Sequence, residues 1–299
     1  MNFQIYNSLG IFLLMNLLTK KDGEKLSMST SQIFFLTDKN QITIPFNKHC
    51  FERSNTKDDL DTYLLKAYLR FYCTVSGRIC TTLDAITSGC GYSIKCNSRI
   101  SNEKFRLMLL SLQQDNLIYC DKDLRDIKNS EYFELQLQNN DIFYCDKNFV
   151  SLTMKEYETI INSKTTTKKN ILLATYLCIK KHIYNNTDTP APQLSIPSNE
   201  SIKKATGVSS VTTVKSAISE LKKLGMIYCS ETIYYYKDVK SNTYMQTRNV
   251  YALDQRELIH TKRVLTEFYQ SNVYAANEMD ADKIMLVKRK KHGEDIENV

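Results

Sequence analysis

This sequence lacks the features that mark the common classes of enzyme. It has eight glycines and contains neither G-x-x-x-x-G-K-[ST] nor G-x-G-x-x-G, so it offers no recognisable phosphate-cradling loop. It also lacks H-E-x-x-H and G-x-S-x-G, and its four histidines are scattered without carboxylates at motif spacing. We therefore expect a protein that is not an enzyme and that needs no cofactor. A tyrosine nucleophile for DNA nicking stays open, although Tyr234–Tyr236 read more simply as half-buried strand residues.

No apolar run is long enough for a membrane span. The longest, Leu9–Leu18, is interrupted by Asn16 and has about half of the ~20 residues that a span requires. No Lys or Arg lies in the eight residues before it, and no small-residue cleavage site follows, so a signal peptide is not favoured. We expect a cytoplasmic protein with no membrane partner.

The nine cysteines contain no C-x-x-C pair. An odd number without a signal peptide predicts reduced thiols, most of them small buried hydrophobic residues. His49–Cys50 and the pair Cys90 and Cys96 are the only fragments with metal-ligand residue types, and neither has the spacing of a zinc site. We expect no metal. The net charge of +7 is compatible with a partner that carries phosphates.

The chain does contain an internal duplication. NLIYC and GMIYC are nearly the same five residues, they are separated by 109 positions, and each follows a stretch with apolar residues at helical spacing. Other matches occur in the same order at nearly the same separation, which indicates a duplicated unit of roughly 108 residues. The matching pairs are 116–120 with 225–229, 64–69 with 172–177, and 33–44 with 142–152. IFYC at 142–145 also resembles VYAL at 250–253, so we expect a strand to close each copy.

The second copy is the easier one to interpret. Ser198 is a predicted helix N-cap, and Gly207 and Gly225 stand where helices typically end. Apolar residues recur at helical spacing between the two glycines, and Tyr-, Ile- and Val-rich stretches follow. The predicted elements are helices at 168–184, 199–206 and 211–225, a short extended piece at 194–196, and strands at 226–238 and 245–254 that form a hairpin.

Residues 198–227 resemble the winged helix-turn-helix family. The family pattern has a small-residue turn around a glycine, here Gly207, and a Thr-Val pair at the recognition helix, here Thr213–Val214. It then runs E-L-x-x-L-G-x-I into the wing, here Glu220–Ile227. Together with the duplication, this resemblance implies an α+β fold of two tandem winged helix-turn-helix domains with a C-terminal helical tail.

A helix of this kind enters the DNA major groove, and its N-terminal residues face base edges. If Val214, Ala217, Ile218 and Leu221 face inward, small hydroxyl side chains and Lys215 face outward. Basic residues of the preceding helix and of the wing then contact the flanking phosphates. The candidate DNA-binding residues of the second copy are Ser209, Ser210, Thr212, Thr213, Lys215, Ser216, Ser219, Lys203, Lys204, Lys237, Lys240 and Arg248.

The first copy departs from the pattern. Its second helix, expected at 81–91, is followed by YSIKCNSRISNEKF at 92–105, which we interpret as an inserted loop. Whether this copy contacts DNA or only packs is left open. Its candidate DNA-binding residues are Arg99, Asn102, Lys104 and Arg106, with Asn102 suited to adenine.

The expected domains are an N-terminal extension (1–32), winged-helix domain 1 (33–145), winged-helix domain 2 (146–253), and a C-terminal helix and basic tail (254–299). Two linked DNA-binding domains raise affinity without new contacts. This tandem architecture resembles the replication initiators of plasmids and phages. The composition also resembles that of helix-turn-helix proteins on mobile elements of low-GC Gram-positive bacteria. The candidate partners are double-stranded DNA, a second copy of the chain in a homodimer, and the replication machinery. A transcriptional regulator, or a winged-helix protein-interaction module without DNA binding, is the alternative.

Overall fold

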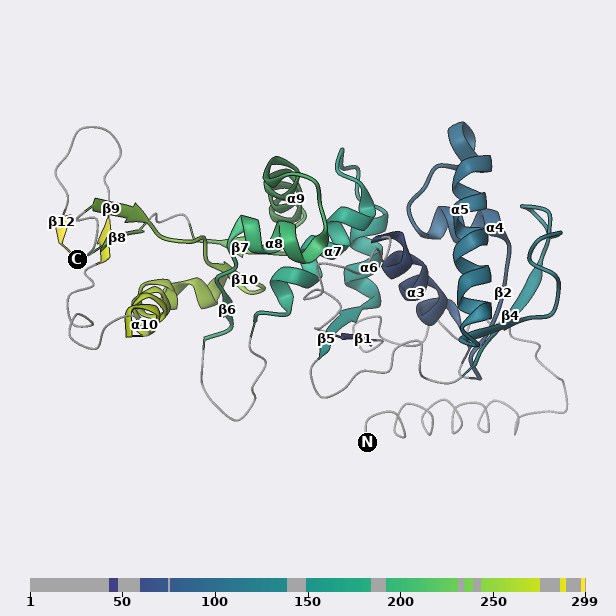
Figure 1. Ribbon diagram of the computed structural model, residues 1–299, viewed down its shortest axis with the longest axis horizontal. Helices are drawn as coiled ribbons and strands as arrows, with labels where there is room; N and C mark the ends of the chain where they lie inside the picture. The colour runs from purple at the N-terminus through teal and green to yellow at the C-terminus, as the bar shows by residue number, and fades with distance from the viewer. Residues whose placement is uncertain are drawn as a thin grey trace, which may run out of the picture. The chain divides into compact units, whose positions relative to one another are not determined.

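The computed structural model describes residues 43–47, 60–74, 76–138, 149–183, 192–230, 234–238, 243–274, 286–288 and 297–298 (Figure 1). These residues form helices and small antiparallel sheets, so the α+β class is confirmed. The chain divides into two compact units, whose largest parts are Leu65–Tyr144 and Glu156–Val299. No helix in the described ranges combines the length and the apolar character that a membrane crossing requires.

The first copy contains a helix, a strand, two helices joined by a short turn, and two further strands. In chain order these are α3 (Leu60–Tyr72), β2 (Arg78–Thr81), α4 (Leu83–Gly89), α5 (Ile94–Gln114), β3 (Ile118–Cys120) and β4 (Phe133–Leu137). The last strand, β4, lies between the other two, because Leu135 pairs with Ile79 on one side and with Cys120 on the other.

The second copy repeats this order of elements. In chain order they are α7 (Lys169–Lys180), β6 (Leu194–Ser195), α8 (Asn199–Thr206), α9 (Val211–Lys223), β7 (Tyr228–Cys229) and β10 (Tyr251–Ala252). The last strand is again central, since Tyr251 pairs with both Ser195 and Cys229. The three helices α7, α8 and α9 pack against one another (Figure 1). Both copies therefore share one element order and one strand order.

The stretches GMIYC and NLIYC have the same structural role in the two copies. Gly225 and Asn116 both adopt the left-handed conformation, with φ of 67° and 54°, directly after a helix. In each copy the next residue closes the helix with a 6→1 hydrogen bond, from Met226 N to Leu221 O (3.0 Å) and from Leu117 N to Leu112 O (2.9 Å). This is the Schellman motif, in which glycine is favoured and asparagine is the usual second choice.

The interpretation of residues 92–105 as an inserted loop is wrong. The helix α5 begins at Ile94, so α4 and α5 are joined by four residues, as are α8 and α9. Between the left-handed residues Gly91 and Asn116 lie 24 residues, whereas 17 lie between Gly207 and Gly225. The seven additional residues lengthen α5 by about two turns.

The predicted hairpin of the second copy is confirmed, but each of its strands is divided in two. Beyond the short base strands β7 and β10, the chain forms β8 (Tyr234–Asp238) and β9 (Thr243–Gln246), in which Tyr235 pairs with Gln246 and Asp238 with Thr243. The first copy has no such extension in its described residues, because a folded loop at 121–132 joins β3 to β4. The strand that pairs with β3 is β4, and 142–145, where we expected the closing strand, lies outside the described residues.

The remaining described elements are not part of the order that the two copies share. They are β1 (Thr43–Asn47), β5 (Phe149–Thr153), α6 (Met154–Ile161), the 3₁₀ helix η3 (Gln255–His260), α10 (Thr261–Tyr274), β11 (Leu286–Lys288) and β12 (Glu297–Asn298). Strand β1 lies next to β5, and β11 lies between β8 and β12. Of the basic run at 288–291, only Lys288 lies within the described residues.

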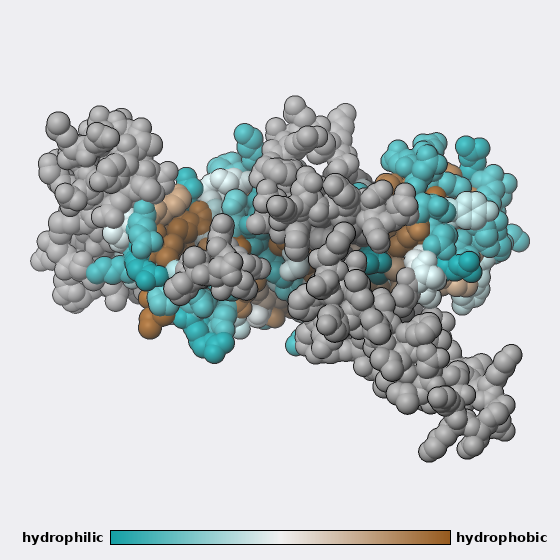
Figure 2. Space-filling model, turned by 90° about the horizontal axis from the view of Figure 1, so that it is seen from below, coloured by the Kyte–Doolittle hydropathy of each residue, from teal (hydrophilic) through white to brown (hydrophobic). Residues whose placement is uncertain are grey.

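The predicted C-terminal helix is present as α10, and it packs on the second copy. Leu265 and Tyr269 of α10 share one buried cluster with Leu194, Val250 and Ala252 of the β6–β10 region. The 3₁₀ helix η3 contacts both β7 and β10. In Figure 2, brown hydrophobic surface lies directly beside teal hydrophilic surface in the left part of the view.

A buried ion pair joins α6 to α7. The Lys180 ammonium lies 2.7 and 2.9 Å from the two carboxylate oxygens of Glu156, and the Tyr176 hydroxyl donates to the same carboxylate. The Lys180 side chain is only 7% exposed. Burial, together with the adjacent Glu156 carboxylate, raises the pKa of Tyr176 far above its usual range. These groups satisfy one another inside the fold.

Candidate nucleic-acid interface

The start and end of α8 and the start of α9 are set by short-range signals. The Ser198 hydroxyl caps α8 by accepting a hydrogen bond from Ser201 N (2.9 Å), and Gly207 ends that helix in the left-handed conformation. The Ser210 hydroxyl caps α9 by accepting from Thr213 N (3.1 Å). The predicted cap at Ser198 and the predicted helix end at Gly207 are both confirmed.

The inner face of α9 is the predicted apolar stripe. Val214, Ala217, Ile218 and Leu221 are all buried, so the helix has a fixed orientation on the second copy. Because residues three and four apart share a helix face, the opposite face is directed away from the core. The side chains exposed on that outer face are Thr212, Lys215, Ser216, Ser219, Lys222 and Lys223.

The outer face of α9 carries hydroxyl and ammonium groups but no freely exposed carboxylate. Glu220, the one acidic residue of α9, has a side chain only 19% exposed and pairs with Lys223 at 3.2 Å. In the described part of the chain, no ion pair involves Lys204, Lys215 or Lys222. The surface therefore attracts anions, and its short hydroxyl side chains allow another molecule to approach the helix backbone closely.

Two of the residues predicted to contact DNA instead stabilise the start of α9. The hydroxyl groups of Ser210 and Thr213 lie 2.8 Å apart and bond to each other, and both side chains are half-buried. Together with the Ser210 cap, this hydroxyl pair holds the first turn of α9 in place. We therefore assign Ser210 and Thr213 to positioning the surface, while Ser209 is exposed beside it.

Helix α8, which packs against α9, also carries basic groups. Lys204 is exposed, and Lys203 is half-buried and lies 3.4 Å from the Glu200 carboxylate. Ion pairs at the protein surface are weak, so the Lys203 ammonium can exchange the Glu200 carboxylate for another anion. The turn between the helices places α8 against α9 (Figure 1), so the helix that carries the predicted lysines contacts the helix that carries the predicted hydroxyls.

Of the three DNA-binding candidates predicted in the hairpin, the structure describes the side chain of Arg248 only. Arg248 is exposed, its backbone N–H donates to the Tyr269 hydroxyl (2.9 Å), and its guanidinium lies 5.2 Å from the centre of the Phe268 ring. Helix α10 therefore holds Arg248 in place at the base of the hairpin. Lys237 lies in β8 opposite Tyr244, but its side chain is outside the description, as is all of Lys240. Burial raises the pKa of Tyr234, which disfavours its reactive phenolate form.

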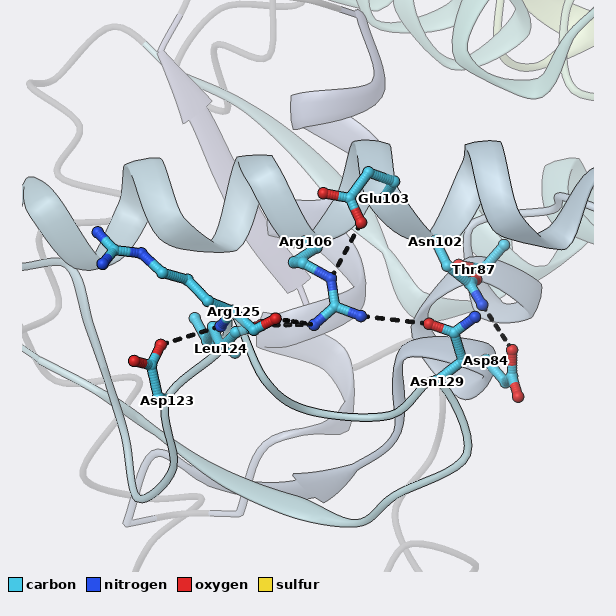
Figure 3. Close-up of polar contacts among 9 residues, drawn as sticks. All are labelled: Asp84, Thr87, Asn102, Glu103, Arg106, Asp123, Leu124, Arg125 and Asn129. Atoms are coloured by element: carbon cyan, nitrogen blue, oxygen red, sulfur yellow. Dashed lines mark hydrogen bonds and ion pairs between the residues drawn. The ribbon is translucent and has the colours of Figure 1, made fainter.

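In the first copy, the structure corrects the predicted role of Asn102. This side chain is 0% exposed. Its amide group donates to the Asp84 carboxylate (2.7 Å), and its carbonyl oxygen accepts from the Thr87 hydroxyl (Figure 3). Asn102 therefore fastens α5 to α4 and is not available to an adenine.

Arg106 likewise has a structural role. Its guanidinium donates to the backbone oxygens of Leu124 and Arg125 and to Asn129 Oδ1 (3.3 Å), all in the loop that joins β3 to β4 (Figure 3). It also pairs with Glu103 at 3.2 Å, and its side chain is only 11% exposed. The loop is thereby held against α5. Lys104 is half-buried, and the side chain of Arg99 lies outside the description.

The outer face of α5 differs in chemistry from that of α9. Between residues 101 and 114 its exposed side chains are Glu103, Leu107, Ser111 and Gln114, and Leu107 is 58% exposed. An exposed carboxylate and an exposed leucine do not suit a phosphate-bearing partner. In the residues compared, only α9 has an outer face of hydroxyl and ammonium groups without an exposed carboxylate or leucine.

The described residues contain no recognisable metal site. No group of three or more His, Cys, Asp or Glu side chains is placed to hold a metal ion there. Cys90 is buried, the Cys96 side chain is outside the description, and His49–Cys50 lies outside the described ranges. Comparison of the chain with protein-family models, curated proteins and solved structures gave no match.

Proposed function

We propose that this chain binds double-stranded DNA sequence-specifically through tandem winged helices, and that α9 of the second copy is its recognition helix. The order helix, strand, helix, turn, helix, strand, strand, with the last strand central in the sheet, is the arrangement of a winged helix-turn-helix. Both copies have this order of elements and strands, which supports the proposal. The hairpin of β8 and β9 is then the wing of the second copy.

The observation that carries the proposal is the outer face of α9. Six exposed hydroxyl or ammonium side chains lie opposite a fully buried apolar stripe, on a helix whose N-terminus follows a tight turn. A helix of this kind fits the major groove, and small hydroxyl residues leave room for the bases. The ammonium groups of that face, Lys215, Lys222 and Lys223, suit phosphates, as do the exposed Lys204 and the half-buried Lys203 of the adjacent helix α8.

The biological role that we propose is replication initiation on a plasmid, phage or other mobile element. The support is the tandem architecture, because two linked readers on one chain bind adjacent repeats with raised affinity. Binding to direct repeats supports an initiator, and binding to a palindrome in the gene's own promoter supports a transcriptional regulator.

The test compares two serine-to-glutamate variants at exposed helical positions. Ser219→Glu places a carboxylate on the outer face of α9, and Ser111→Glu places one on the outer face of α5. Binding of the full chain to random-sequence duplexes about 30 base pairs long is measured by fluorescence anisotropy at several salt concentrations. We expect Ser219→Glu to weaken binding at least tenfold, and Ser111→Glu to leave it within twofold.

The wild-type protein should also show a steep salt dependence. Four to six phosphate contacts predict a slope of roughly −4 to −5 in a plot of log K against log salt concentration. If the wild-type chain binds no duplex at low salt, the proposal fails, and the result favours the alternative of a protein-interaction module. Equal weakening by the two variants refutes the assignment to α9.

A further inference from the structure

The outer face of α9 contains few of the side chains that identify bases most strongly. Arginine selects guanine and Asn or Gln selects adenine through paired hydrogen bonds in the major groove. None of these residue types occurs in α9 (Val211–Lys223). Three of the six exposed side chains carry a hydroxyl group, and the other three are lysines.

The hydroxyl positions discriminate weakly between bases. Thr212, Ser216 and Ser219 each both donate and accept, so every base pair can satisfy them. The methyl group of Thr212 adds an apolar contact that suits the thymine methyl group. These three residues therefore bring the backbone of α9 close to the DNA but leave the choice of base largely open.

Lys215 differs from the other two lysines of this face. It lies in the second turn of α9, on the part of a recognition helix that reaches base edges, whereas Lys222 and Lys223 lie in the last turn. Lys223 is also engaged by Glu220 at 3.2 Å, while Lys215 is exposed and enters no ion pair in the described part of the chain. Its ammonium can donate to guanine O6 and N7.

We infer that Lys215 is the specificity-determining residue of α9 and that it selects a single guanine. The neighbouring positions are then read through thymine methyl contact and the shape of the duplex. The chain should consequently recognise sites in which one G·C pair is strongly required and its neighbours tolerate substitution. This inference rests on the proposed DNA-binding function and adds to it the kind of site that is bound.

The experiment selects bound duplexes from a random pool with the full chain and with three variants. Lys215→Ala removes the proposed reader, Lys215→Arg keeps a guanine donor, and Lys222→Ala is the matched control on the same helix. We expect Lys215→Ala to lose the preference at one guanine by about 5- to 150-fold. Lys215→Arg should retain that preference. Lys222→Ala should weaken all sequences alike and reduce the salt slope by about 0.9.

The outcomes separate the inference from the function on which it rests. If the wild type selects a motif that Lys215→Ala leaves unchanged, the inference is overturned and DNA binding stands. The same conclusion follows if the wild-type motif requires no guanine next to α9, or if Lys222→Ala changes the motif as Lys215→Ala does. If the wild type enriches no sequence and binds no duplex, the proposed function itself fails.

Discussion

Substituting Gly225 tests whether the left-handed residue after α9 matters for its conformation alone. An added Cβ at this position meets nothing within 4 Å, so a steric clash with neighbouring side chains is excluded. The only penalty for Gly225→Ala is then the left-handed backbone, at φ 67°, which is unfavourable for an L-residue by roughly 1–2 kcal/mol. We expect the free energy of unfolding of the second copy to fall by that amount.

The first copy provides the matched comparison. Asn116 occupies the corresponding position at φ 54° and makes the same helix closure. Asparagine tolerates this region better than alanine, so Gly225→Asn should cost about half as much as Gly225→Ala. Urea unfolding followed by circular dichroism measures both. With a slope of about 1–3 kcal/mol per molar, the alanine variant should unfold at a midpoint lower by about 0.3–2 M.

The reasoning is refuted by either of two results. If alanine and asparagine shift the midpoint equally, the left-handed conformation is not the source of the penalty. If alanine has no effect, Gly225 does not adopt that conformation in solution, and the structural equivalence of the two copies at this point is lost.

Three further predictions concern charged groups. Glu156→Ala should lower the free energy of unfolding by about 3–5 kcal/mol in urea titrations, because it leaves the buried Lys180 ammonium uncompensated; a loss below about 1 kcal/mol contradicts the buried pair. Arg106→Lys should lower the free energy of unfolding by about 1.5–3 kcal/mol, because an ammonium cannot make the guanidinium's several contacts to the loop. The same substitution should leave duplex affinity unchanged, and a large loss of affinity would show that Arg106 contacts DNA. Hydrogen bonds from Arg256 lower the pKa of Asp254 from its usual 3.8 to about 2, so its contribution to stability is present above about pH 4 and is lost as the pH falls through 2. The difference in thermal midpoint between wild type and Asp254→Asn should therefore shrink from about pH 5 to about pH 2, and a constant difference argues against the contact.

The second copy could be predicted closely because its signals are local. Ser198 caps the helix that it precedes, Gly207 and Gly225 end helices, and the stripe from Val214 to Leu221 is buried as its spacing requires. Each of these features depends on a few neighbouring residues, and one sequence is enough to read them.

The first copy was harder to predict from the sequence, because the contacts that fix its structure join residues that are not neighbours in the chain. The start of α5 is rich in Asn and Ser, which favour turns, so the sequence suggested a loop. Asn102 looked like a base reader, but Asp84 and Thr87 of another helix bind its amide. The packing of α10 on Leu194 and Val250 likewise joins residues far apart in the chain, which no periodic pattern reveals.

The most direct test of the DNA interface is lysine footprinting of the unmodified chain. The protein is acetylated with and without excess random-sequence duplex at low salt, and the modified lysines are quantified by mass spectrometry. We predict that duplex protects Lys204, Lys215 and Lys222, while Lys122, an exposed lysine on the loop of the first copy, reacts equally in both conditions. Protection of Lys122 with continued reactivity of Lys215 would contradict the assignment of DNA binding to α9.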